Sequence, residues 1–232
     1  MTSTCMHLER LTLIDGNTCE HSCRLSSPTK VGLFNARSVA SSGKSQSIST
    51  WVSELKLTAA GQVETWHDGP DTPALVACAP PGYVCAERSR SRPDDKVDTN
   101  TMSTNHGGVS FTATGCTRES STPHSTRHLN TAVFLHGSGL KSLFVVICRS
   151  GSAAAPSSFF DEFADLLDHV TSYSSVVIMG DVNLHLESPT DAGAVKFSSL
   201  LAMSNLVHQS PTHTAGHQLD VVVVRSDRPI LW

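Results

Sequence analysis

The feature that most constrains the fold is an amphipathic stretch lying between two strand-length apolar runs. Six apolar residues between positions 159 and 170 recur at i, i+1, i+4, i+7, i+8 and i+11, which places them on one face of a helix. Ser158 is its expected N-cap. The runs on either side, Leu143–Cys148 and Val176–Met179, have the length of buried strands. Alternating strands and helices predict the α/β class.

The same reasoning predicts most of the remaining elements. They are a strand at Val31–Phe34, a helix at Ile48–Leu57, a strand at Gln62–Trp66, a strand after Gly107-Gly108, a hairpin of Thr131–Leu135 with Leu143–Cys148, a helix at Ala192–Leu206 and a strand at Leu219–Val224. Residues 1–30 are polar and aperiodic, so we interpret them as a loose leader before a domain at 31–232. Pro70–Asn100 is rich in proline and charge, which predicts a long surface excursion.

Composition excludes several classes of protein. A net charge of −4 and a pI near 6.3 exclude a strongly basic nucleic-acid coat, but they are compatible with a nuclease that focuses charge in a groove. No apolar run reaches the roughly 18 residues of a membrane span. Seven irregularly spaced cysteines and the lack of a secretory signal predict an intracellular protein, nuclear or cytoplasmic.

Polar side chains stand at the ends of four predicted strands. They are Asn35, Glu64, Asp181 with Asn183, and Asp220. Strand ends of an α/β sheet converge on one crevice. Oxygen ligands gathered there suit a hard cation such as Mg²⁺ (or Mn²⁺), which polarises a phosphate and activates water. These residues therefore predict metal-assisted hydrolysis of a phosphate ester.

Five sequence blocks resemble the signature blocks of the endonuclease/exonuclease/phosphatase superfamily, in the same order. They are Phe34–Ser38, Val63–Trp66, Asn105–Val109, Gly180–His185 and Pro211–Asp220. Over about residues 31–227 the chain resembles the apurinic-type endonuclease domain of non-LTR (LINE-like) retrotransposons. The resemblance implies a four-layered α/β sandwich of two packed sheets flanked by helices. It also implies Mg²⁺-dependent nicking of DNA that leaves a 3′-hydroxyl to prime reverse transcription.

The resemblance also implies a role for each site residue. Glu64 corresponds to the principal metal carboxylate and Asn35 to a second metal ligand. Asp181 corresponds to the residue that orients or deprotonates the attacking water, and Asn183 to the one that hydrogen-bonds the scissile phosphate. Asp220 corresponds to the carboxylate that orients a catalytic histidine. The implied partners are DNA and a reverse transcriptase domain in the parent element.

One local positive cluster is a candidate for contacting DNA phosphates. It consists of Arg88, Arg90 and Arg92. Three aspartates between residues 94 and 98 offset its charge, so a solvated loop is the alternative interpretation.

The chain departs from the family pattern at three places, one of which is a Ser/Thr/His-rich gap at Thr112–Asn130 that matches poorly. The family ends on one more strand with a Ser-Asp-His motif, whereas here Ser226-Asp227-Arg228 follows the Asp220 strand closely and has arginine in place of histidine. A family tyrosine is replaced by Cys148, which we expect to be a small core residue. These departures predict, as the alternative function, a truncated remnant that lacks the last strand and has no enzymatic role. A lipid-headgroup phosphodiesterase of the same fold is a third possibility, against which the Pro211–Asp220 block argues.

Overall fold

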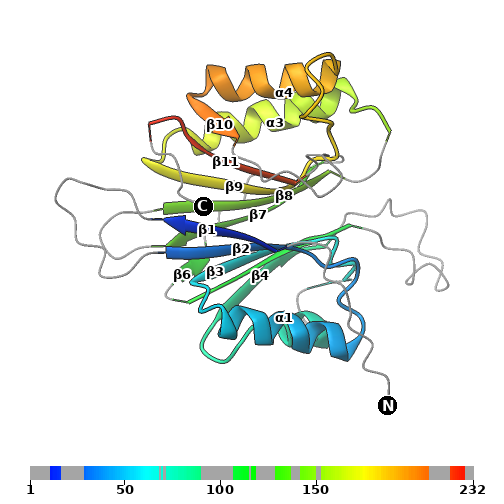
Figure 1. Cartoon of the computed structure of the whole chain (residues 1–232), viewed down its shortest axis with the longest axis vertical. Helices are drawn as coiled ribbons and strands as arrows, with labels where there is room; N and C mark the ends of the chain where they lie inside the picture. Colours follow the sequence, from blue (N-terminus) through cyan, green and yellow to red (C-terminus); the bar gives the residue numbers. More distant parts are fainter. Residues whose placement is uncertain are drawn as a thin grey trace.

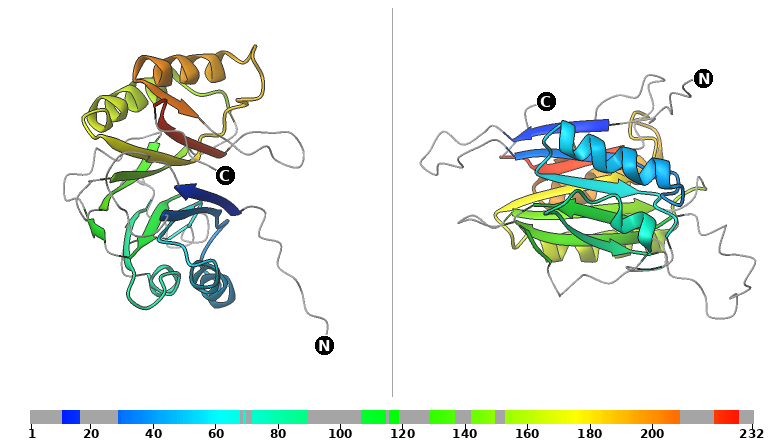
Figure 2. Two further views of the ribbon diagram at one scale, coloured as in Figure 1. Left: turned by 60° about the vertical axis from the view of Figure 1, so that its left-hand side comes forward. Right: turned by 90° about the horizontal axis from the view of Figure 1, so that it is seen from below.

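Two β-sheets pack face to face, with helices covering both outer faces (Figure 1). Helices α3 (Ser157–Val170) and α4 (Ala192–Met203) cover one sheet, and α1 (Ser42–Glu54) covers the other, as the turned views also show (Figure 2). This arrangement confirms the predicted four-layered α/β sandwich. The computed structural model describes residues 11–16, 29–67, 69, 72–89, 107–114, 116–118, 129–136, 142–149, 153–208 and 220–227.

The first sheet has five strands among the described residues. Their order across the sheet is β1 (Leu11–Gly16), β2 (Thr29–Asn35), β3 (Ala59–Val63), β5 (Val109–Ala113) and β4 (Val84–Arg88). Strands β2 and β3 are parallel and the other neighbours are antiparallel. The parallel pair brings the C-terminal ends of β2 and β3 to the same edge of the sheet.

The second sheet has six strands within the described ranges. Their order is β10 (Leu206–His208), β11 (Asp220–Arg225), β9 (Ser175–Asp181), β8 (Ser142–Arg149), β7 (Leu129–His136) and β6 (Cys116–Arg118). Antiparallel pairing of β7 with β8 confirms the predicted hairpin. Strand β8 then runs parallel to β9, with α3 as the crossover helix between them.

The central strands β8, β9 and β11 of the second sheet are apolar on both faces because both of their faces are covered. In β8, Leu143, Val145 and Ile147 pack in the core beneath α3 and α4. The alternate residues Phe144, Val146 and Cys148 pack between the two sheets. Cys148 is thus a core residue, as expected. This double burial explains why these strands are continuous apolar runs rather than alternating ones.

Helix α3 packs against helix α4 through a row of phenylalanines. Phe163 stacks on Phe159 and, with ring centroids 4.7 Å apart, on Phe197 of α4. The predicted N-cap at Ser158 is wrong, because the helix begins at Ser157 with Pro156 as its N-cap residue. Proline has the fixed φ that a helix start requires, so the helix begins without a side-chain cap.

Two predicted irregular segments contain regular structure. Leu11–Gly16 of the supposed loose leader is strand β1, whose register pairs it along its whole length with β2. The Pro70–Asn100 excursion includes a short helix, α2 (Pro73–Val76), and strand β4. Strands β1 and β4 obtain their backbone hydrogen bonds from neighbouring strands. Local sequence does not predict such pairing.

Helix boundaries also differ from the predicted ones. Helix α1 begins at Ser42, where the side chain of Ser41 accepts a hydrogen bond from the Lys44 backbone N–H. Helix α4 ends at Met203, because Asn205 takes a left-handed conformation (φ 57°) and the chain enters β10.

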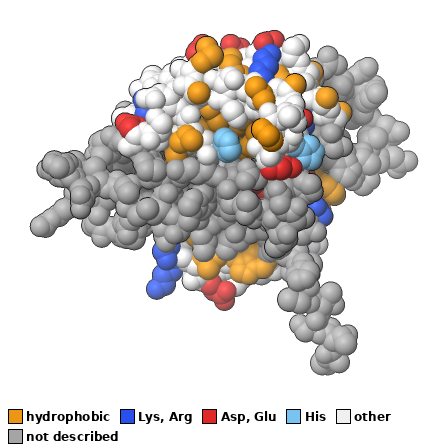
Figure 3. Space-filling model, turned by 45° about the horizontal axis from the view of Figure 1, so that its top comes forward, with side chains coloured by type: hydrophobic (Ala, Val, Ile, Leu, Met, Phe, Trp, Pro, Cys, Tyr) orange, Lys and Arg blue, Asp and Glu red, His pale blue; other side chains and the backbone are white. Residues whose placement is uncertain are grey.

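The outer face over α4 carries isolated apolar side chains. Val195, Met203 and Val207 are exposed. Figure 3 shows apolar side chains on this face separated by polar atoms rather than gathered in one area. Scattered apolar side chains of this kind are normal on a protein surface. Within the described part of the chain, no helix has the length and apolar character needed to cross a bilayer.

We expect Phe163→Ala to lower the free energy of unfolding by about 3–5 kcal/mol, because it removes the ring that joins α3 to α4 and leaves a cavity. Urea denaturation followed by circular dichroism measures the change. Asp165→Ala, at an exposed position of the same helix, is the control and should change it by less than about 0.5 kcal/mol. Equal effects of the two substitutions would contradict this packing.

Candidate active site

Two of the predicted acidic residues lie on neighbouring strands of the second sheet. Asp181 is the last residue of β9 and Asp220 is the first residue of β11. Because these strands are antiparallel, the end of one lies beside the beginning of the other, and the two Cα positions are register partners. The structure therefore brings these two carboxylates side by side.

Glu64 comes to the same region from the first sheet. It directly follows β3, and its charge is near enough to raise the pKa of Asp181. The close approach of the sheets is visible at Gly61 of β3, where a Cβ would lie 2.9 Å from Val146 Cγ2 and 3.0 Å from Met179 Sδ. Three predicted site carboxylates thus lie in the same region, near enough for the charges of two of them to act on Asp181.

The Asp181 carboxyl group has an unusual protonation equilibrium. Only 4% of the residue is exposed, and this burial, reinforced by the charges of Asp220 and Glu64, raises its pKa from 3.8 to about 7. A hydrogen bond from the Asn183 backbone N–H to Oδ1 (2.9 Å) and the charge of Arg149 act in the opposite direction. A carboxylate with a pKa near neutrality is suited to act as a general base.

Gly180 fixes the approach of β9 to β8. It has a φ of 152°, and a Cβ at this position would lie 1.8 Å from the carbonyl oxygen of Ile147. No other residue fits there without separating the two strands. The residue before Asp181 is therefore constrained by backbone packing.

Arg149 is a site residue that the sequence reasoning missed. It is the last residue of β8 and is 4% exposed. Its Nε donates to the carbonyl of Val182 (2.6 Å), Nη2 to that of Asn183 (2.5 Å) and Nη1 to that of Ala153 (3.1 Å). A buried guanidinium with three carbonyl acceptors holds the loop after β9 in place. The available signal was a single arginine immediately after the apolar run that forms β8.

Asn183 is held by the same arginine. Its backbone is left-handed (φ 49°), and its Nδ2 donates to the carbonyl of Arg149 at 2.8 Å. One amide hydrogen is therefore committed to this bond, and Nδ2 has a second one to donate. The predicted contact of Asn183 with a phosphate stays a prediction.

Asn35 and Glu64 are placed together by hydrogen bonds between two loops. The backbone N–H of Ala36 donates to the carbonyl of Val63 (2.9 Å), and that of Ser38 donates to the carbonyl of Glu64 (2.8 Å). Strand β3 ends earlier than predicted because Glu64 itself is left-handed (φ 53°). The loops after β2 and β3 thus run side by side.

The oxygen donors of these two loops fit a hard divalent cation. Glu64 is half-buried, and the Asn35 Oδ1 accepts a long bond (3.2 Å) from the Arg37 N–H. Among the described residues, no three His, Cys, Asp or Glu side chains are close enough to hold one ion. A site with one carboxylate, one amide oxygen and several waters is compatible with Mg²⁺, which dehydrates reluctantly.

Arg88 lies at the same edge of the first sheet. The register pairs Asn35 with Val63 and Val63 with Val109, and Val109 with Arg88 at the end of β4. At the usual strand spacing Arg88 is roughly 10 Å from the strand that leads to Glu64. Arg90 and Arg92 lie outside the described residues.

Comparisons with known proteins rest on structure alone, since no family model and no curated protein sequence matches this chain. The endonuclease domain of TRAS1, a telomere-specific non-LTR retrotransposon, is similar with a TM-score of 0.59 at 10% identity, covering 86% of each chain. The AP endonuclease LMAP from Leishmania major has a TM-score of 0.59 at 12% identity, covering 93% of this chain and 84% of that one. The human Nocturnin catalytic domain has a TM-score of 0.60 at 14% identity, covering 93% and 85%.

The chain has the endonuclease/exonuclease/phosphatase fold. At identities of 10–14% these similarities concern the fold alone. The arrangement of the site residues comes from the geometry of this chain itself.

Ser226 and Asp227 lie away from the site in this endonuclease/exonuclease/phosphatase fold. They follow β11 at its far end, about 20 Å along the strand from Asp220. There the Ser226 backbone N–H donates to the carbonyl of Asn205, and Arg225 donates to the carbonyl of Tyr173. Ser226 and Asp227 therefore supply no group to the carboxylates.

We expect the stability of the metal-free protein to fall as pH rises from about 4 to about 7. Between these values native Asp181 keeps a proton that the unfolded chain has lost, so deprotonation favours unfolding. Asp181→Asn removes this cost, which at about 1.4 kcal/mol per pKa unit is a few kcal/mol. The variant should therefore gain stability relative to wild type between pH 5 and pH 8, measured by urea denaturation in EDTA. Asp165→Asn, an exposed carboxylate, is the control, and parallel pH curves for all three proteins would refute the buried-acid assignment.

Proposed function

We propose that this chain is a divalent-metal-dependent phosphodiesterase that nicks DNA and leaves a 3′-hydroxyl. The observation that supports this most is the meeting of Asp181, Asp220 and Glu64 from two facing sheets, with the pKa of Asp181 raised to about 7. Mutually repelling carboxylates are held together at a cost in stability, as expected where they bind a cation or transfer a proton.

In this proposal Glu64 and Asn35 hold Mg²⁺ or Mn²⁺. When bound, the ion polarises a phosphate oxygen and stabilises the charge that develops on it. The left-handed backbone of Glu64, fixed by the Ser38 N–H, determines which way this residue leaves β3. The neighbouring Asn35 comes from the loop that is hydrogen-bonded to it.

Asp181 accepts the proton of the attacking water. The Asn183 backbone N–H fixes one oxygen of its carboxylate, and the charge of Asp220 increases its basicity. Asp220 thus acts on Asp181 through its charge. The second Nδ2 hydrogen of Asn183 is available for an oxygen of the scissile phosphate.

The choice of DNA as substrate is supported by the kinds of protein that share the fold. They include the endonuclease domain of a non-LTR retrotransposon and an AP endonuclease. In that setting the 3′-hydroxyl primes a reverse transcriptase of the parent element. Arg88, with Arg90 and Arg92, contributes phosphate contacts beside the Glu64 edge of the sheet.

A second candidate is a folded but inactive remnant of such a nuclease. It is favoured by the position of Ser226 and Asp227 at the far end of β11, distant from Asp220. A plasmid-nicking assay distinguishes the two candidates.

We expect the purified protein to nick supercoiled plasmid in Mg²⁺ and not in EDTA. Glu64→Gln and Asp181→Asn should each lower the nicking rate by about 10²–10⁴-fold, because they remove a metal ligand and the general base. Agarose gels give the rate, and extension of the nick by a DNA polymerase reports the 3′-hydroxyl. The exposed Asp165→Asn is the matched control and should nick like wild type. If the wild-type protein is folded but does not nick DNA in Mg²⁺, the chain is the inactive remnant.

Arg149 should control the pH dependence of nicking. Its charge lowers the pKa of Asp181, so Arg149→Met raises that pKa and moves the acid limb of the pH–rate profile to higher pH. The loss of three carbonyl contacts should also reduce the rate by roughly 10–100-fold. Arg149→Lys keeps the charge and should retain the wild-type acid limb. An unmoved limb in both variants would show that Asp181 is not the titrating base.

A further inference from the structure

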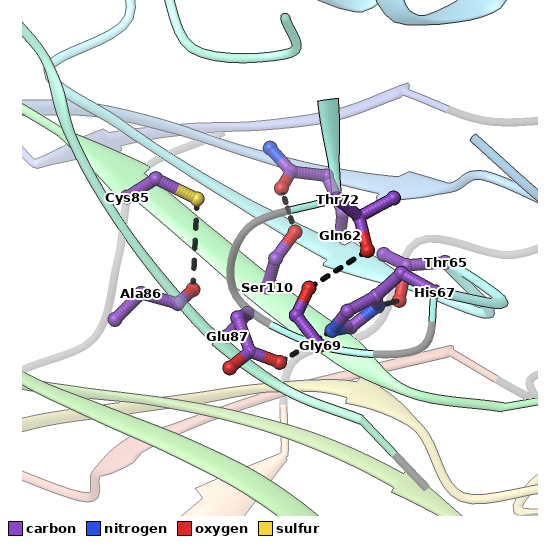
Figure 4. Close-up of polar contacts among 9 residues, drawn as sticks. All are labelled: Gln62, Thr65, His67, Gly69, Thr72, Cys85, Ala86, Glu87 and Ser110. Carbon is purple, nitrogen blue, oxygen red and sulfur yellow. Dashed lines mark hydrogen bonds and ion pairs between the residues drawn. The ribbon is translucent and has the colours of Figure 1, made fainter. Parts of the chain in front are cut away.

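A buried chain of hydrogen bonds begins at the residue after Glu64. Thr65 Oγ1 lies 2.6 Å from His67 Nδ1, and His67 Nε2 lies 2.5 Å from Glu87 Oε2 (Figure 4). Thr65 and His67 are buried, and the Glu87 side chain is 11% exposed. Glu87 belongs to β4, so the chain joins an edge strand to the loop that carries Glu64.

The geometry of this chain gives each group a definite role. The Glu87 carboxylate beside Nε2 favours the tautomer with its hydrogen on Nε2, which leaves Nδ1 as an acceptor for the Thr65 hydroxyl. Thr65 and His67 are too deeply buried to contact a bound substrate. The three residues therefore act on the loop and not as a nucleophilic triad.

The loop that they hold contains two residues with a left-handed backbone, one on each side of Thr65. Glu64 has a φ of 53° and Trp66 a φ of 52°. This conformation is unfavourable for a residue with a side chain, and it persists only where its surroundings determine it. The Thr65 N–H donates to the carbonyl of Gly108 (3.3 Å), and its carbonyl accepts from the Val39 N–H (3.0 Å).

Packing against Gly108 makes the position of Thr65 specific. A Cβ on Gly108 would lie 2.8 Å from Thr65 Oγ1 and 3.2 Å from His67 Nδ1. The hydroxyl and the imidazole thus fill the space that a glycine leaves, and the Thr65 side chain has little freedom to turn away. Its inward orientation fixes the course of the backbone from which Glu64 projects.

We propose that Thr65, His67 and Glu87 are positioning residues that hold Glu64 in its metal-binding conformation. This inference rests on the proposed function, since Glu64 is the metal carboxylate there. Breaking the chain should release the left-handed turn and weaken metal binding while the sheets stay intact. Removing an outer-sphere partner of a metal ligand commonly weakens metal affinity 10–100-fold.

The test compares two identical substitutions at buried threonines. Thr65→Val removes the hydroxyl that bonds His67, and Thr112→Val removes the hydroxyl that accepts from Gln62 Nε2 (3.3 Å) in the same sheet. Mn²⁺ binding is measured by the electron paramagnetic resonance of free Mn²⁺, without DNA. Circular dichroism checks that each variant is folded, and Glu64→Gln defines the loss of the site.

We expect Thr65→Val to weaken Mn²⁺ binding at least about tenfold, Thr65→Ser to restore it, and Thr112→Val to leave it unchanged. Glu87→Ala, at the more accessible end of the chain, should weaken it in the same way and serves if Thr65→Val does not fold. The Mg²⁺ concentration for half-maximal nicking should shift in parallel.

Wild-type affinity in folded Thr65→Val or Glu87→Ala, or equal loss in Thr112→Val, overturns the positioning role. If the wild-type protein binds Mn²⁺ but does not nick, the proposed function fails and the positioning role is still decided by the variants. A wild-type protein that neither binds Mn²⁺ nor nicks overturns both.

Discussion

Electrostatic repulsion at the junction of two sheets is the constraint on which the site depends. Asp181 and Asp220 are register partners, and the charge of Glu64 acts on Asp181 from the facing sheet. Such a cluster stays in place only if the surrounding backbone is rigid enough to resist this repulsion. The two apolar cores on either side of the second sheet supply that rigidity, because strands β8, β9 and β11 are buried on both faces. The strands that form the cores are therefore the same ones that carry Asp181 and Asp220.

Much of the fold is predictable from the sequence because its signals are periodic. The phenylalanines and leucines of α3 repeat at helical spacing, and β8, β9 and β11 are uninterrupted apolar runs. Strand β1 and the short elements α2 and β4 were missed, since their conformation depends on neighbours distant in sequence. The N-cap of α3 was wrong by two residues because a proline can begin a helix without a capping side chain.

In the site too, the residues next to periodic elements were predicted, and those that depend on contacts distant in sequence were not. Glu64, Asp181 and Asp220 stand next to recognisable strands, so strand order alone indicates that they converge. Arg149 and the pair of His67 with Glu87 act through contacts between separate strands and loops. Nothing in their local sequence specifies such partners, since a buried hydrogen bond depends on tertiary geometry.

The close packing at Gly180 determines how this fold tolerates sequence change. A single added methyl group there collides with the Ile147 carbonyl, next to Asp181. A copy of this sequence that accumulates random substitutions therefore has two routes to inactivity. Loss of Asp181 removes the general base of the proposed mechanism and leaves a folded protein, whereas loss of Gly180 separates the central strands. Relic sequences that keep this glycine after losing the aspartate would be ones still selected to fold.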